Sequence, residues 1–324
     1  MSEDQASWPR PMSKVTGPYR KEKIEGAALS LGEVAPATLS LFREGIMIPD
    51  MMSGLTLFLI ARQPRASLRE NADGDREESG KAPKKRGAPG VSGGIWVREQ
   101  ATYHHPLLFA ESFTTEGAST GRHVHKGRRY ATTESVTENA LGQLASTNRT
   151  TGLLSYRVDP DLEDSAEGQL LDDMPEPAAD WTRAGSNPHL EELAGARVGE
   201  ILGDESLVIS LEMMAVRDTE NPENPIHSDP ESARAAGLKK PIAGGSHVQA
   251  FALETVMARF GPGVLLHGAY VDSRWKMPTE AGDAITPRAE IVVVEQDRVE
   301  IALEVRHETG SIAMVGRILI PRPR

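Results

Sequence analysis

Two long segments of this chain are apolar on nearly all sides, and each stands ahead of a run of strand-like sequence. The first extends from Met51 to Arg62, and the second extends from Ser246 to about Phe260, where Gly261-Pro262-Gly263 ends it. A helix that is apolar around its whole circumference is usually a buried helix. The repeated order of one helix and then several strands therefore predicts two units, each with an antiparallel sheet packed around a buried helix.

The strand-like segments lie between turn residues and are rich in apolar and β-branched side chains. In the N-terminal half they are Ile95–Tyr103, Leu107–Thr115, Arg128–Thr137 and Leu144–Leu154; in the C-terminal half they are Ser206–Ala215, Val264–Trp275, Ala289–Glu295, Arg298–Arg306 and Ser311–Ile320. The halves also share a short pattern, since Tyr103-His104-His105-Pro106 with Glu111 corresponds in spacing to Trp275-Lys276-Met277-Pro278 with Asp283. These features predict an internal repeat whose two sheets meet edge to edge.

Shifts in composition divide the chain. Residues 1–30 are rich in Pro, Lys and Glu and predict an extended or partly ordered arm, and residues 64–94 are charged and aperiodic, which predicts a mobile surface loop. From Val158 to Asp180 there are nine acidic residues, no basic residue and three prolines, as in an interdomain linker. We therefore expect an N-terminal domain at 1–157, a linker at 158–190 and a C-terminal domain at 191–324.

Charge and composition exclude several classes of function. A net charge of −11 argues against a general nucleic-acid binder, and the absence of cysteine excludes thiol nucleophiles and cysteine metal sites. The longest apolar run, Leu55 to Ala61, is too short to span a bilayer, and residues 1–14 lack the apolar core of a signal peptide. We expect a soluble, cytoplasmic protein.

Two groups of residues could bind ions, but the sequence favours simpler interpretations. His104, His105, His123 and His125 have no acidic partner at ligand spacing, so we predict no metal site. Lys84-Lys85-Arg86 and Lys126-Gly127-Arg128-Arg129 are candidates for contact with phosphate, the second with a pantetheine carrier. Solvated, exposed segments are the favoured interpretation of both.

The stretch from Asn224 to Gly245 concentrates the residues that carry chemistry. His227 follows a proline in a tight turn, and Ser228, Pro230 and Glu231 have the spacing of a capping box at the start of a short helix that Gly237 would end. Gly245 then opens the long apolar helix and leaves backbone N–H groups at its N-terminus. A histidine facing these groups would pair a general base with an oxyanion site.

Asn224-Pro225-Ile226-His227, the residues Ser228 to Gly237, and Pro241-Ile242-Ala243-Gly244-Gly245 resemble the hydratase signature of the MaoC-like, (R)-specific enoyl-CoA hydratases of the hotdog superfamily. The resemblance covers 205–322 strongly and 35–156 weakly. It implies an α+β double hotdog, with two antiparallel sheets each wrapped around a long central helix, and an N-terminal copy without the catalytic motif.

The family motif reads Asp-x-Asn-Pro-x-His, and the Asp position is Pro222 in this chain. The tandem Glu-Asn-Pro of residues 220–225 suggests a short duplication that displaced the acid. Asp218 is the first candidate because it follows the expected strand, Glu223 is the second and Glu220 the third. Loss of the acid is the remaining alternative.

The resemblance implies a hydro-lyase acting on 2-enoyl or 3-hydroxyacyl thioesters, with His227 as base and Asp218 or Glu223 as its partner. Asn224, Gly244, Gly245, Ser246 and His247 would bind the substrate, an acyl-CoA or acyl-carrier thioester, and no metal or other cofactor is implied. A homodimer of the covalent pseudo-dimer is compatible with this picture, and neither nucleic acid nor membrane is an expected partner. The alternatives are a non-catalytic acyl-binding or assembly subunit and, ranked last, a thioesterase, because no carboxylate lies between Lys239 and Phe251.

Overall fold

The computed structural model describes residues 8–12, 14–17, 21–52, 95–154, 158–175, 178–217 and 225–323. The N-terminal half contains β1 (Arg10–Pro11), β2 (Val15–Gly17), α1 (Lys21–Leu29), η1 (Gly32–Val34), α2 (Pro36–Arg43), η2 (Pro49–Met51), β3 (Ile95–Tyr103), β4 (Phe113–His125), β5 (Arg128–Glu138) and β6 (Leu144–Leu153). The connecting region contains β7 (Ser165–Gly168), η3 (Leu171–Asp173), η4 (Trp181–Ser186) and α5 (Leu190–Ala194). The C-terminal half contains β8 (Ile201–Gly203), β9 (Leu207–Val208), α6 (Leu211–Arg217), η5 (Pro225–His227), α7 (Pro230–Ala235), α8 (Gly245–Phe260), η6 (Val264–Leu266), β10 (Ala269–Trp275), β11 (Ala284–Val294), β12 (Arg298–His307) and β13 (Ile312–Pro321).

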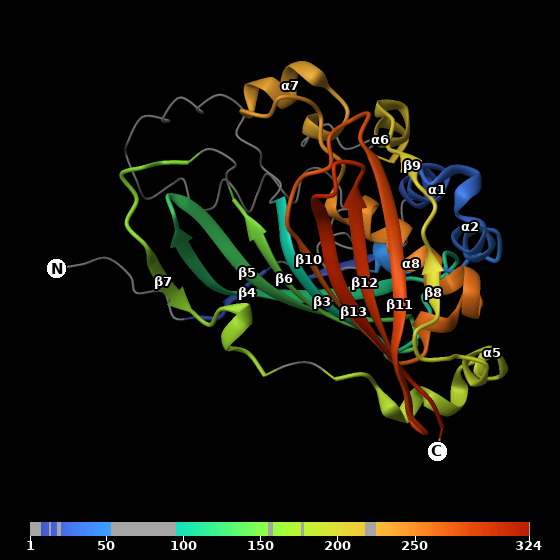
Figure 1. Cartoon of the computed structure of the whole chain (residues 1–324). Coiled ribbons are helices and arrows are strands. Elements are labelled where there is room, and N and C mark those ends of the chain that lie inside the picture. Colours follow the sequence, from blue (N-terminus) through green and yellow to red (C-terminus); the bar gives the residue numbers. More distant parts are fainter. Residues whose placement is uncertain are drawn as a thin grey trace.

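The strands of both halves join into one sheet (Figure 1). Its order is β1-β4-β5-β6-β3-β10-β13-β12-β11-β8, with β2 and β7 also on β4 and β9 on β11. Among the described strands every pairing is antiparallel. The halves meet where β3 pairs with β10, from Ala269 opposite Tyr103 to Arg274 opposite Arg98. The predicted edge-to-edge meeting of two sheets is therefore confirmed.

Helix α8 forms the centre of the core. It packs against β11 and β12, and its apolar side chains are buried on several faces, among them Phe251, Val256 and Phe260. The predicted buried helix from Ser246 to Phe260 is confirmed to within one residue. The other predicted buried helix, Met51 to Arg62, lies almost wholly outside the described residues, as does the loop at 64–94.

A carboxylate on α8 also fixes the helices of the N-terminal half. Glu254 accepts hydrogen bonds from the N–H groups of Ala37 (2.8 Å) and Thr38 (2.9 Å) and from the Thr38 hydroxyl (2.7 Å). These are first-turn donors of α2, whose own N-cap, Ala35, has no side-chain acceptor. Burial raises the pKa of Glu254, although the three hydrogen bonds act in the opposite direction.

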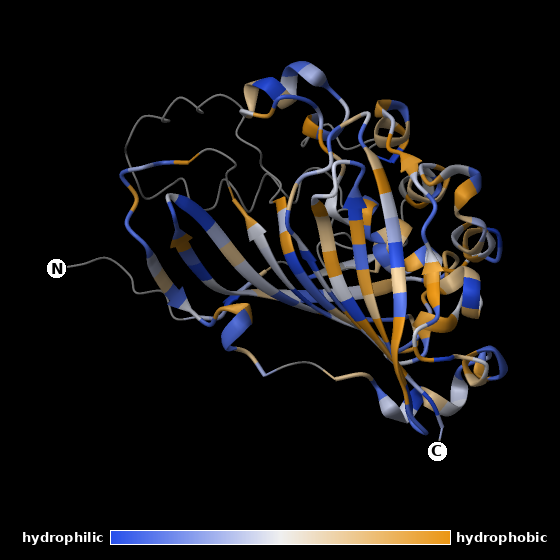
Figure 2. Cartoon of the chain, in the orientation of Figure 1, coloured by the Kyte–Doolittle hydropathy of each residue, from blue (hydrophilic) through white to orange (hydrophobic). Residues whose placement is uncertain are grey.

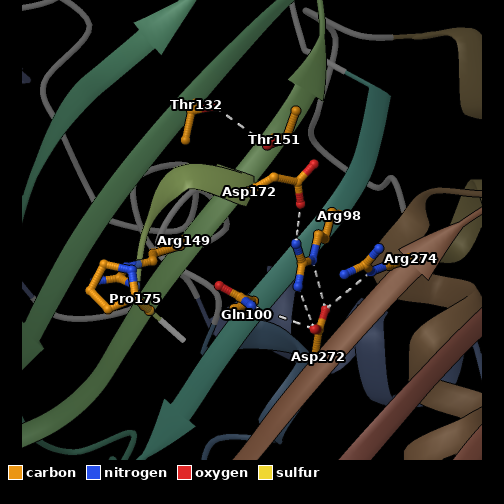
Figure 3. Close-up of polar contacts among 9 residues, drawn as sticks. All are labelled: Arg98, Gln100, Thr132, Arg149, Thr151, Asp172, Pro175, Asp272 and Arg274. Atoms are coloured by element: carbon orange, nitrogen blue, oxygen red, sulfur yellow. Dashed lines mark hydrogen bonds and ion pairs between the residues drawn. The ribbon is translucent and has the colours of Figure 1, made fainter. Parts of the chain in front are cut away.

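The acidic linker crosses the face of the sheet opposite α8 (Figure 3). Asp172 pairs with Arg98 of β3 (2.5 Å), the Pro175 carbonyl accepts from Arg149 of β6 (2.6 Å), and Asp180 contacts His104 (2.8 Å). Most of residues 158–175 are exposed, as predicted for a surface linker, although 165–168 add a short strand to the sheet.

Several sequence predictions about secondary structure are wrong. Ser206–Ala215 is not one strand: only Leu207–Val208 pair, and Leu211–Arg217 form α6 because the Ser210 hydroxyl caps the helix by accepting the Met213 N–H (3.1 Å). The strand expected at Leu107–Thr115 begins at Phe113, and Val264–Leu266 form a 3₁₀ turn ahead of β10. The arm at 1–30 contains helix α1, which buries Ile24 and Ala27.

Two histidines, His247 in the core and the partly buried His267, predict that acid destabilises the fold. Burial, with the Arg183 charge as second cause, lowers the pKa of His267 to about 4, and burial holds the pKa of His247 well below its ordinary value. Between pH 6.5 and 4 the unfolded chain therefore binds protons that the folded chain does not, so stability falls as the pH falls.

We expect a Tm about 5 °C lower at pH 5 than at pH 7.5, measured by circular dichroism. His267→Gln should reduce this difference, and an equal fall in both proteins would contradict the assignment.

No helix in the described part of the chain combines the length and apolar content that crossing a bilayer requires.

Candidate functional site

His227 ends the short turn η5, and a hydrogen bond fixes its ring. The ring nitrogen Nδ1 lies 2.7 Å from the Ile242 carbonyl oxygen. A carbonyl oxygen only accepts, so Nδ1 carries the proton and the lone pair of the neutral ring is on Nε2. The backbone adds a second link, since the Ile242 N–H donates to the Ile226 carbonyl (3.3 Å). The turn and the strand-like segment ahead of α8 thus hold the ring in one orientation and one tautomer.

The short helix after His227 has its own small core and its own cap. Ile226, Ala233, Leu238 and Ile242 pack together. The predicted cap at Ser228 is wrong by one residue: the Asp229 carboxylate accepts from the Glu231 and Ser232 N–H groups, since Pro230 is the first helical residue. Gly237 ends α7 as predicted, with φ of 91° and its N–H on the Arg234 carbonyl.

The N-terminus of α8 lies beside this turn. Gly244 is the N-cap residue, and a Cβ built on it would lie 4.0 Å from Cε1 of His227. No acceptor among the described residues takes the N–H groups of Gly245 and Ser246, which are in the first helical turn. The histidine ring and these N–H groups therefore stand at one place, where developing negative charge would be stabilised.

Two tryptophans from the two halves of the sheet close over Gly245. The Trp275 indole N–H donates to the Gly245 carbonyl (3.0 Å), and Trp96 packs edge-on against Trp275 with ring centroids 5.6 Å apart. Trp96 is on β3 and Trp275 on β10, so the N-terminus of α8 stands at the seam between the halves. Sequence analysis missed both tryptophans, because their position depends on the pairing of β3 with β10.

We expect Gly245→Ala to impair the site. A Cβ on Gly245 would lie 3.1 Å from both Trp275 Cε2 and Trp96 Cβ, which is closer than side chains normally pack. The indole or the helix must shift, and a misplacement of this kind in a catalytic site costs up to about a hundredfold in rate. Gly244→Ala, where the nearest atom is 3.9 Å away, is a control for folding only, since Gly244 itself lies beside His227. Unaltered kinetics of Gly245→Ala would remove Gly245 from the site.

His247 and Gln249 point into the protein. His247 is 1% exposed, stacks on Phe251 and lies 3.4 Å from the Ser30 carbonyl through Nε2. Gln249 is fully buried and donates from Nε2 to Glu99 (3.2 Å) and Ser273 (3.1 Å). The His247 side chain therefore packs in the core under the helix start, whereas residues 244–246 are partly exposed.

The candidate acids Asp218, Glu220 and Glu223, with Asn224, lie outside the described residues. Asp218 follows helix α6 and not a strand, so the reason given for preferring it no longer applies. Its neighbour Arg217 is anchored by an ion pair with Asp50, in which the two side chains are 9% and 3% exposed. Burial raises the pKa of Asp50, and Arg217 acts against that shift. The C-terminal end of helix α6 is thus anchored to the N-terminal half by this ion pair.

The basic turn and His125 beside it have a carboxylate partner from the linker. Lys126 and Gly127 have φ of 49° and 69° in the two-residue turn between β4 and β5, as in a type I′ hairpin. Asp164 of the linker accepts the Lys126 N–H (2.8 Å) and contacts His125 (3.1 Å). The negative charge of the Asp164 carboxylate at this turn disfavours the binding of a phosphate group there. Among the described residues, no three His, Cys, Asp or Glu side chains are placed to hold a metal ion.

Comparison with known proteins agrees with this architecture. Residues 217–312 match the family profile described as "MaoC like domain". No curated protein sequence matches the chain. Among solved structures, a protein titled "MaoC-like dehydratase" is 16% identical, with a TM-score of 0.66 over 97% of this chain and 98% of that one.

Two further structures extend the likeness over the whole chain. A MaoC-like dehydratase from Phytophthora capsici is 14% identical, with a TM-score of 0.63 over 97% of this chain and 95% of that one. A conserved hypothetical protein from Mycobacterium tuberculosis, described as having a double hotdog fold, is 15% identical, with a TM-score of 0.56 over 97% and 96%. The predicted double hotdog fold is therefore confirmed.

Proposed function

We propose that the chain is a hydro-lyase acting on an acyl thioester, because residues 217–312 match the MaoC-like domain profile and the chain has a double hotdog fold. It adds water across the 2,3-double bond of a 2-enoyl thioester, or removes water from the 3-hydroxyacyl thioester. The thioester is an acyl-CoA, and the product has the (R) configuration.

The observation that carries this proposal is the His227 ring beside the N-terminus of α8. Its Nδ1–H is held by the Ile242 carbonyl at 2.7 Å, so Nε2 is the basic nitrogen. The N–H groups of Gly245 and Ser246 begin the helix one residue beyond Gly244, against which the His227 ring lies. A base next to backbone donors suits a reaction that removes a proton while a carbonyl oxygen gains charge.

In the hydration direction, Nε2 of His227 takes a proton from water as the water oxygen bonds to C3. The electron pair of the 2,3-bond moves toward the thioester carbonyl, and the resulting enolate oxygen accepts from the Gly245 N–H. C2 then takes the proton that Nε2 of His227 received from water, the enolate collapses to the thioester, and the His227 ring is neutral again. The net change is the addition of one water, and dehydration follows the same steps in reverse.

A carboxylate partner completes the proposal. We assign it to Asp218 or Glu223, both of which precede the turn that holds His227. Asn224, Gly244 and Ser246 are proposed to contact the thioester. His247, whose ring is buried against Phe251, acts by fixing the helix start.

The second candidate function is a binding subunit without activity. It is favoured by one observation, the Pro222 at the position of the family's acid. Such a protein would bind acyl thioesters and leave them unchanged.

An assay with a panel of 2-enoyl-CoA thioesters of increasing chain length distinguishes the hydro-lyase from the binding subunit. Loss of the absorbance of the conjugated thioester, with the 3-hydroxyacyl product identified by chiral chromatography, is the expected result. Binding of the thioesters with no change in absorbance at any chain length would establish the binding subunit instead.

A further inference from the structure

The two halves of the sheet share one fold, but their inner faces differ in chemistry. In the C-terminal half most of the buried inner residues are apolar, among them Ala289, Ile291, Val299, Ile301, Leu303 and Val305, although Ser273 on the same face is polar. In the N-terminal half they include Thr115, Thr137, Ser146, Asn148 and Thr150, each at most 3% exposed. In Figure 2 the ribbons of β4–β6 have fewer strongly hydrophobic residues than those of β11–β13. The C-terminal half shows that this fold can be built with an apolar inner face. The polar side chains on the inner face of the N-terminal half are therefore not required by the fold.

The polar face begins beneath the first turns of α8. Gln249, one helical turn after Gly245, bonds both Glu99 of β3 and Ser273 of β10, which are paired across the seam. Thr150 of β6 lies opposite Glu99, and Thr133 of β5 lies opposite Thr150. Directly opposed side chains share a face of the sheet. A row of polar groups thus leads from the N-terminus of α8 into the N-terminal half.

Two oxygens on this face lack a donor. Gln249 uses Nε2 for Glu99 and Ser273, and its buried Oε1 has no hydrogen-bond partner among the described residues. Asn148 donates from Nδ2 to the Met52 carbonyl (3.2 Å) and the Ser146 hydroxyl (3.3 Å). Its buried Oδ1 likewise has no hydrogen-bond partner among the described residues. Both residues are more than nine-tenths buried. Buried acceptors without a donor are uncommon in folded proteins, so a bound molecule that supplies donors here would explain them.

We propose that this face selects an acyl chain that carries hydroxyl groups beyond the reacting carbons. This inference rests on the proposed function and names its substrate class. The thioester sits at the N-terminus of α8, and the acyl chain extends along the polar row, where its hydroxyl groups donate to Gln249 Oε1 and Asn148 Oδ1. An alkyl chain would leave these acceptors unsatisfied. A negatively charged chain would be repelled by Glu99.

The test compares matched pairs of thioesters. Hydration of 2-hexenoyl-CoA and 6-hydroxy-2-hexenoyl-CoA is followed by kcat/KM, and binding of their saturated analogues, hexanoyl-CoA and 6-hydroxyhexanoyl-CoA, is measured by calorimetry. The wild type should prefer the hydroxylated member about tenfold or more in both measurements, since a site built to bond a hydroxyl rejects the analogue without it. Asn148→Leu and Thr150→Val should reduce the preference.

Thr132→Val is the matched control. Thr132 is fully buried on the opposite face of the same half, 3.4 Å from Thr151 (Figure 3), so it undergoes the same chemical change away from the row. Its preference should equal that of the wild type. Equal or stronger binding of the alkyl thioesters overturns the inference, whether or not hydration occurs. If no thioester is hydrated but the hydroxylated analogue still binds more tightly, the proposed hydro-lyase function is wrong and the inferred acyl-chain preference stands.

Discussion

Replacing His227 with alanine is expected to lower turnover of an enoyl thioester by about two or more orders of magnitude, the usual contribution of a general base. The structure supplies the reason, since the Ile242 carbonyl holds Nδ1–H at 2.7 Å and leaves Nε2 as the basic atom. The fold should survive, because the buried side chain of this turn is that of Ile226, and His227 is only partly buried. Stopped-time assays under saturating substrate, with circular dichroism as the check on folding, measure both.

His227→Gln is the matched variant for this prediction. Its amide can still donate to the Ile242 carbonyl, so the turn keeps its hydrogen bond, but no basic nitrogen remains. It should be as inactive as His227→Ala. Activity close to wild type in His227→Gln would mean that the ring serves only to hold the turn.

Charge-neutral variants of the three candidate acids identify the partner of His227. Among Asp218→Asn, Glu223→Gln and Glu220→Gln, only the acid that faces the site should lose activity to a similar extent. Three variants with wild-type turnover would mean that the reaction proceeds without a carboxylate from this segment.

The sequence predicted several strands well because strand periodicity is local, whereas most of β4 was missed. Strand β3 begins and ends at the predicted residues, and β5 and β6 do so within one residue. Helix α1 was missed although its signal is present: Ile24, Ala27, Ala28 and Leu31 have helical spacing and are all buried. Helix α6 was missed because Leu207-Val208-Ile209 suggests a strand, and the capping Ser210 was not recognised.

The candidate site was predictable only in part. The order of His227, the short helix and the glycines is a local pattern, and the structure brings His227 and Gly244 together. Trp96, Glu99 and Asp50 join this region only through tertiary pairing, over separations of more than a hundred residues from Trp275, Gln249 and Arg217. Nothing in a local pattern specifies such partners.

The largest expected effect on stability comes from the ion pair across the seam. Arg98 of β3 donates to both Asp272 oxygens of β10, from Nε at 3.0 Å and from Nη2 at 2.7 Å (Figure 3). The side chains are 12% and 8% exposed. The Asp272 interaction raises the pKa of Arg98 against the effect of burial, which is the largest single cause and lowers it. The guanidinium therefore stays charged in a place where water is nearly excluded.

Asp272→Ala should therefore destabilise the protein by about 3 kcal/mol, the lower end of the cost of breaking a buried ion pair, because the largely buried guanidinium then has the exposed Asp172 in place of its buried partner. Asp172→Ala is the matched control: it removes a partner of the same arginine, but one that is 82% exposed, and should cost less than about 1 kcal/mol. Denaturant midpoints at constant m-value give both numbers. The double variant Arg98→Met, Asp272→Leu should recover most of the loss, since an apolar pair has no charge to desolvate. If Asp272→Ala costs no more than Asp172→Ala, the seam is held by the backbone pairing of β3 with β10, and the ion pair serves only to bind the acidic linker to the sheet.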